Sequence, residues 1–142
     1  MHLHNEVIAR YRTVAVVGLS PRPDRHSHEV AQYLQSHGYR IIPVNPTAAG
    51  QTILGETCYP TLTEAASELA KFGVDIEIVN CFRKSEDIGP IADEAIAIGA
   101  NCLWMQLDIV NPAAAAHARQ AGLIVVMDRC LKIDHMHATN LV

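Results

Sequence analysis

Five apolar runs of strand length recur along the chain, and helical periodicity follows most of them. The runs cover residues 13–19, 39–44, 74–81, 102–106 and 123–127. Apolar positions three and four residues apart predict helices over 3–11, 25–37, 61–71 and 85–98, and an alanine-rich helix after Asn111-Pro112. Alternation of strands and helices is typical of βαβ units, which build parallel sheets. The sequence therefore predicts an α/β fold with an open parallel sheet of five strands.

Local signals refine this prediction. The first run is continuously apolar and β-branched, as a strand covered on both faces should be, so we expect it to be a central strand. The charge of Glu77 inside the third run predicts an edge or a strand end there. Residues 53–54 predict a short extended piece, and the helix over 3–11 is expected across one sheet edge. Residues 128–142 show no clear period and yield no predicted element.

Length and composition narrow the class of protein. The 142 residues, 49% of them hydrophobic and 18% charged, suit one ordered domain over 1–142. A net charge of −4 argues against a nucleic-acid partner, which would favour a basic face. No apolar stretch approaches the ~20 residues that span a bilayer, and the polar start lacks a signal-peptide pattern. The four cysteines are widely spaced without a CxxC motif, so we expect reduced thiols, no membrane partner and a cytoplasmic location.

The segment after the first strand carries the strongest chemical signal. Residues 18–27 combine a glycine, two serines, two arginines and the start of a helix. Backbone N–H groups and guanidinium groups in such a segment can bind a phosphate. Gly18 stands alone without a GxGxxG pattern, which weakens a dinucleotide interpretation. From composition alone, a surface loop with solvated arginines explains the segment equally well.

The ends of the other strands add candidate ligand contacts, because ligands of open parallel sheets gather at the carboxyl ends of the strands. Asn45-Pro46 follows the second strand, and Phe82-Arg83 follows the third. A proline or aromatic edge there suits a purine ring, although Asn45-Pro46 also reads as a simple turn and Phe82 as core. Trp104 and Met105 lie where a long ligand would run, or else belong to the core.

Five stretches in order resemble the small CoA-binding domain proteins, which are similar to the N-terminal CoA-binding domain of the succinyl-CoA synthetase alpha subunit. The stretches are residues 14–20, 27–31, 38–46, 82–86 and 126–130, with Trp104-Met105-Gln106 between the last two. The resemblance covers nearly the whole chain. It departs from the family pattern at Asn80, where aspartate is more usual, and at Asp108, where glycine is usual.

The resemblance implies a Rossmann-like fold, with helices on both faces of the sheet, that binds coenzyme A or an acyl-CoA over the ends of the first three strands. It implies phosphate contacts near Gly18, Ser20, Arg22 and Arg25, and adenosine contacts near Val44, Asn45, Pro46 and Phe82, with Arg83 a further cation in the same crevice. The synthetase keeps its phosphorylated histidine in a second domain, for which this chain is too short, so ligase chemistry is not implied.

Three functions stay open from the sequence. The first is a stand-alone CoA-binding module that acts as a sensor, a carrier or a partner-dependent subunit, with a possible homo-oligomer or protein partner. The second is an NADP-type protein or reductase, and the third is acyl transfer by Cys81 or Cys130 with a base such as His135. A metal site is not expected, because His26 and His28 do not share a helix face.

Overall fold

The computed structural model describes residues 3–140 and contains a parallel sheet at its centre. The sheet has five strands in the order β2-β1-β5-β6-β7, and every pair of neighbours is parallel. The strands are β1 (Thr13–Val17), β2 (Arg40–Val44), β5 (Ile78–Cys81), β6 (Cys102–Met105) and β7 (Ile124–Val126). A small antiparallel hairpin, β3 (Thr52–Ile53) with β4 (Glu56–Thr57), accounts for the short extended piece predicted near 53–54.

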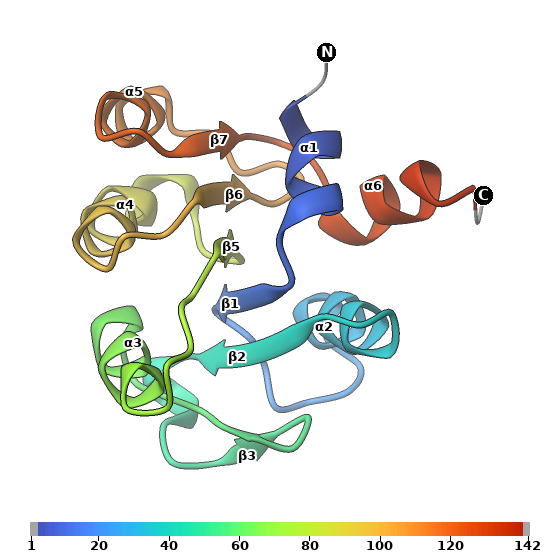
Figure 1. The fold of residues 1–142 in the computed structure, drawn as a ribbon. Helices are drawn as coiled ribbons and strands as arrows, with labels where there is room; N and C mark the ends of the chain where they lie inside the picture. The colour runs from blue at the N-terminus through green and yellow to red at the C-terminus, as the bar shows by residue number, and fades with distance from the viewer. Residues whose placement is uncertain (1–2, 141–142) are drawn as a thin grey trace.

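Helices cover both faces of the sheet, so the molecule has three layers (Figure 1). One face carries α1 (Leu3–Arg10), α2 (His26–Ser36) and α6 (Leu131–Ala138), and the other carries α3 (Leu62–Ala70), α4 (Ile88–Ala97) and α5 (Pro112–Gln120). Two short 3₁₀ turns, η1 (Pro46–Ala48) and η2 (Ser85–Asp87), follow β2 and β5. Each face has its own cluster of buried apolar side chains. The fold is Rossmann-like, as predicted.

Capping side chains begin two of the helices where the sequence indicates. Thr61 Oγ1 accepts the backbone N–H of Glu64 at 3.1 Å at the start of α3. Asn111 Oδ1 accepts the backbone N–H of Ala114 at 3.0 Å at the start of α5, and Pro112 occupies its first turn. These bonds satisfy N–H groups that have no partner inside the helix.

The strands are shorter than the apolar runs. The run over 74–81 forms a strand only from Ile78, and Glu77 lies just before its start. The Glu77 backbone still bonds to Thr13 O and Cys102 N, while its carboxylate accepts the N–H groups of Arg12 and Thr13 at 2.9 and 3.0 Å. The strand end predicted from the charge of Glu77 is therefore confirmed. β1 lies inside the sheet between β2 and β5, although β5 is the middle strand.

Helix α6 has no counterpart in the sequence prediction. Its buried positions are Leu131, Asp134 and His135, so two of the three are polar and leave no apolar periodicity. The guanidinium of Arg129 binds the carboxylate of Asp134 at 2.7 and 2.9 Å, which allows that charge to lie inside. α6 packs against α1 and α2, and α1 in turn reaches the edge strand β7.

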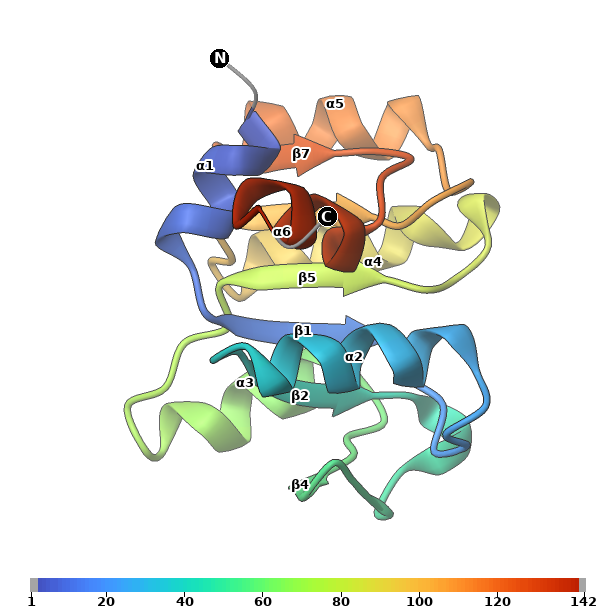
Figure 2. The ribbon, with the colours of Figure 1, turned by 90° about the vertical axis from the view of Figure 1, so that its right-hand side faces the viewer.

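The order in which strands are added to the sheet reverses between β1 and β5. The chain passes from β1 to β2 on one side, returns to β5 on the other side of β1, and then continues to β6 and β7. Figure 2 shows the arrowheads of β1, β5 and β7 at one edge, where the loops into α2 and α6 also lie. At such a switch point the loops diverge, which makes a crevice at the carboxyl ends of the strands.

Candidate functional site

Gly18 brings the ends of β1 and β5 into direct contact at the switch point. Its N–H donates to Val44 O at 2.7 Å, and the N–H of Phe82 donates to Val17 O at 2.8 Å. Gly18 has φ +95°, and a Cβ atom there would lie 2.4 Å from the carbonyl oxygen of Phe82. Only glycine fits this approach without a shift of the backbone.

A pocket of about 340 Å³ opens beside this contact, on the α2 face of the sheet. We call it the α2 pocket, and its lining residues are Gly18, Ser20, Arg22, Arg25, His26, Ser27 and Phe82. The Oγ of Ser27 accepts the N–H of Ser20 at 3.0 Å, and His28 Nδ1 lies 2.9 Å from Ser20 O. The first turn of α2 therefore holds the loop that follows β1.

The electrostatics of the α2 pocket favour an anion. Arg25 is the N-cap residue of α2 and no side chain caps this end of the helix, so the helix dipole and first-turn N–H groups act at the pocket. Arg22 forms an ion pair with Asp24 at 3.1 Å, but both side chains are exposed. Because exposed pairs contribute little, Arg22 is able to exchange Asp24 for a ligand anion.

A second pocket of about 310 Å³ lies at the same edge of the sheet but on its other face. We call it the α3–α4 pocket, and its lining residues are Val17, Val44, Pro46, Pro60, Thr61, Leu62, Arg83, Glu86, Asp87, Pro90, Ile91 and Glu94. The side chain of Arg83 passes close to Gly18, 3.1 Å from where a Cβ would stand, and its guanidinium lies 4.0 Å from Asp87. Arg83 thus connects the β1 end with this second pocket.

The structure therefore divides the predicted contact residues into two groups. Gly18, Ser20, Arg22, Arg25 and Phe82 line the α2 pocket, whereas Val44, Pro46 and Arg83 line the α3–α4 pocket.

Asn45 lines neither pocket. Its Nδ2 donates to Leu19 O at 3.0 Å, and its Oδ1 accepts from the N–H and hydroxyl of Thr47 at 3.1 and 2.8 Å. Its polar atoms are used to join the loops after β1 and β2, so Asn45 positions the site, which agrees with its interpretation as a turn residue.

The predicted thiol chemistry finds no support at Cys81. Its side chain is fully buried, and burial raises the pKa of the thiol to about 12. His135 Nδ1 is bound to the hydroxyl of Tyr33 at 2.7 Å. Burial, and then the nearby His37 and Arg12, lower the pKa of His135. Cys130 is also buried, with 4% of its surface exposed.

The ends of β6 and β7 are occupied by core and internal hydrogen bonds. Trp104 is fully buried, and its Nε1 donates to Arg129 O at 2.8 Å, so the core interpretation of this residue is correct. Asp108 has φ +70°, a conformation that glycine adopts most easily, and its N–H donates to Asp128 Oδ1 at 2.7 Å. This conformation gives a physical reason for the glycine that the family resemblance implies at position 108.

Sequence reasoning missed the residues that α3 and α4 contribute to the α3–α4 pocket. The capping pattern at Thr61 was a usable signal, because it sets the start of the first α-helix after β2, and the helix of a βαβ unit begins at the edge where the preceding strand ends. The acidic residues Glu86, Asp87 and Glu94 carry no comparable signal.

Among residues 3–140, no group of three or more His, Cys, Asp or Glu side chains is arranged to hold a metal ion. No helix in that range is long and apolar enough to cross a membrane.

An open parallel sheet with cationic side chains and a helix N-terminus at its switch point defines a class of domains that bind phosphate-bearing cofactors. Residues 12–136 match the family described as CoA binding domain, and the chain belongs to that family. It is 41% identical over 130 residues to the uncharacterized protein YneT of Bacillus subtilis (strain 168), covering 92% of this chain and 90% of YneT.

Solved structures of similar sequence have the same fold. A hypothetical protein from Pyrococcus horikoshii OT3 is 34% identical with a TM-score of 0.85, and the match covers 96% of this chain and 89% of that one. The Thermus thermophilus protein cell-free ID.343 is 29% identical with a TM-score of 0.81, and the match covers 94% of each chain.

Proposed function

We propose that this protein binds coenzyme A, free or acylated, across the carboxyl ends of β1, β2 and β5, and acts as a stand-alone binding or sensor module, or with a protein partner, without ligase chemistry. One observation carries the proposal. In a chain of the CoA-binding family, the α2 pocket combines Arg22, Arg25 and an uncapped helix N-terminus at the switch point. The diphosphate would lie there, since guanidinium and backbone N–H groups both bind phosphate oxygens.

The α3–α4 pocket suits the adenosine part of the ligand. Val44 and Pro46 offer apolar walls. Phe82 lines the α2 pocket, and the next residue in the chain, Arg83, lines the α3–α4 pocket. Arg83 would meet the 3′-phosphate, because its side chain reaches past Gly18 at the junction. Glu86, Asp87 and Glu94 would repel further phosphates from this side and so favour one orientation of the ligand.

The cellular setting follows from the thiols. All four cysteines are free and buried, as expected of a protein in a reducing compartment, and we propose a cytoplasmic location on that ground.

The first experiment measures thermal stability during titration with CoA, acetyl-CoA, NADP and ATP. A ligand that binds the native state raises its apparent stability by mass action. We expect the largest rise with CoA or acetyl-CoA. A rise with NADP alone would replace the proposal with a dinucleotide function, and no rise with any ligand would remove it.

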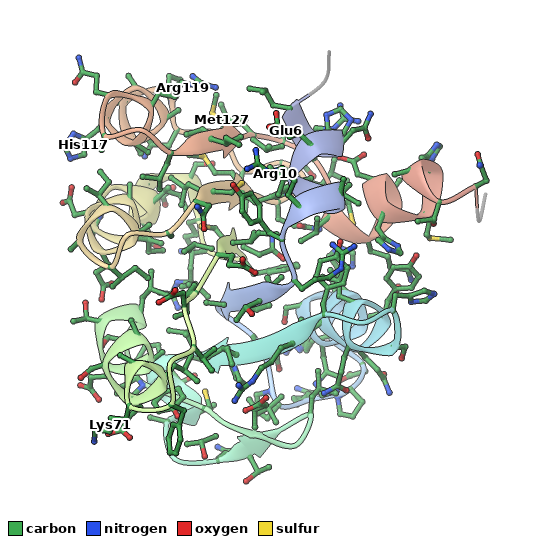
Figure 3. All side chains as sticks on the ribbon, in the orientation of Figure 1. Glu6, Arg10, Lys71, His117, Arg119 and Met127 are labelled. Atoms are coloured by element: carbon green, nitrogen blue, oxygen red, sulfur yellow. The ribbon has the colours of Figure 1, made fainter. Side chains whose placement is uncertain are left out.

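The second experiment tests the phosphate contacts. We expect the double variant Arg22→Ala/Arg25→Ala to lower CoA affinity at least about a hundredfold, because hydrogen bonds to charged groups contribute about 1.5–3 kcal/mol each. Arg119→Ala is the matched control, since Arg119 lies in the last turn of α5 in the other helix layer (Figure 3). Equal CoA affinity of the double variant, Arg119→Ala and the native protein would refute the phosphate assignment.

A further inference from the structure

Two amide side chains lie buried below the α2 pocket with hydrogen-bonding capacity left over. Asn80 and Gln106 are 0% and 2% exposed, and Asn80 Nδ2 donates to Gln106 Oε1 at 3.1 Å. Within residues 3–140, Asn80 Oδ1 and Gln106 Nε2 are the buried side-chain polar atoms that have no hydrogen-bond partner. A buried polar atom without a partner is costly, so these two atoms indicate a missing binding partner.

The orientation of the two amides is set by the start of α6. The N–H of Leu131 donates to Gln106 Oε1 at 3.4 Å, which requires the oxygen of Gln106 on that side. If both amides were flipped, Gln106 Nε2 would face the N–H of Leu131, donor against donor. The pair therefore presents a free acceptor oxygen on Asn80 and a free NH₂ group on Gln106.

The pair and the α2 pocket lie on the same face of the sheet. Side chains two residues apart on a strand point to the same face, so Asn80 lies on the face of Ile78, which belongs to the core under α1, α2 and α6. Phe82 comes two residues after Asn80 and lines the pocket. Its ring is only partly buried and rests edge-on against His26, with 5.9 Å between ring centroids. The Phe82 ring is therefore the side chain whose rotation would open the pocket toward the amide pair.

We infer that Asn80 and Gln106 recognise the amide groups of the pantetheine arm of CoA, an inference that rests on the proposed function. Asn80 Oδ1 would accept an amide N–H of the arm, and Gln106 Nε2 would donate to an amide C=O. Binding would proceed with rotation of Phe82, and the ligand would satisfy both buried atoms. The carboxamide of a nicotinamide cofactor has the same chemistry, so the test includes NADP.

The experiment compares CoA with adenosine 3′,5′-bisphosphate, which lacks the arm, by calorimetry. We expect Asn80→Leu and Gln106→Met each to lower CoA affinity about tenfold and to leave the affinity for the bisphosphate unchanged. Cys102→Ala is the matched control for packing damage, because Cys102 is buried in the same layer at the other end of β6. It should leave the affinity for both ligands unchanged.

A measurement on the native protein keeps the inference testable if a variant does not fold. The side-chain NH₂ resonances of Gln106, in ¹⁵N-labelled protein, should shift on addition of CoA and stay in place with the bisphosphate. Unchanged Gln106 resonances, unchanged CoA affinity in both variants, or an equal loss for both ligands would each overturn the inference. Native protein that binds neither ligand would instead overturn the proposed function, and NADP binding weakened by Asn80→Leu would assign the pair to nicotinamide.

Discussion

Replacing Gly18 by alanine tests whether the close contact between the β1 and β5 ends holds the site together. Gly18 has φ +95°, and a left-handed conformation costs a non-glycine residue about 1–2 kcal/mol. The new Cβ would also lie 2.4 Å from Phe82 O, about 1 Å inside ordinary contact, and that oxygen belongs to the backbone and cannot rotate away.

The two strand ends must therefore separate. Separation weakens the hydrogen bond from Phe82 N to Val17 O, and the shift of residue 18 distorts the bond from its N–H to Val44 O at the end of β2; each bond contributes about 1 kcal/mol. We expect Gly18→Ala to lower the free energy of unfolding by about 3 kcal/mol in total, and to weaken CoA binding as well.

Gly122→Ala is the matched control. Gly122 has nearly the same φ, +96°, but a Cβ there would meet nothing within 4 Å, so only the conformational cost of about 1 kcal/mol applies. Urea unfolding can be followed by the fluorescence of Trp104, the one tryptophan, which is fully buried. Equal losses in the two variants would refute the argument that the contact with Phe82 requires glycine.

Two further predictions concern titratable side chains outside the pockets. Because burial lowers the pKa of His135, the unfolded chain binds a proton at this residue more readily than the folded protein does. The free energy of unfolding should therefore be at its full value above about pH 6.5 and fall as the pH drops below that value. His135→Gln should flatten this fall in urea unfolding measured from pH 8 to pH 5. A steeper fall in the variant would contradict the assignment. Burial raises the pKa of the Cys81 thiol to about 12, so we expect Cys81 to react with a thiol reagent only at the rate of global unfolding. Fast labelling of Cys81 at pH 7.5, located by peptide mass spectrometry, would reopen the thiol mechanism.

The placement of charge makes the proposed anionic ligand compatible with an acidic chain. The net charge of the chain is −4, yet Arg22 and Arg25 line one pocket at the N-terminal end of a helix. At physiological ionic strength the charges farther than about 8 Å are largely screened. A ligand in the α2 pocket therefore responds chiefly to the two guanidinium groups and the helix end.

The sequence by itself determined the fold class and every helix except α6. A strand covered on both faces needs apolar side chains in both directions, so Thr13–Val17 and Cys102–Met105 are recognisable from their composition alone. The caps at Thr61 and Asn111 act on N–H groups three residues away, so these helix starts are also local information. The hypothesis of a phosphate site in the loop after Val17 also rests on local sequence, and it stays a prediction.

Only the tertiary structure decided which strands are neighbours and what they bring together. The order β2-β1-β5-β6-β7 depends on pairing between residues far apart in the chain, and the apolar runs are too alike to specify it. The contact of Gly18 with Phe82 and the joining of Asn80 to Gln106 both depend on that order. Asn80 is paired inside the core with a residue that follows another strand, and no local pattern identifies that partner.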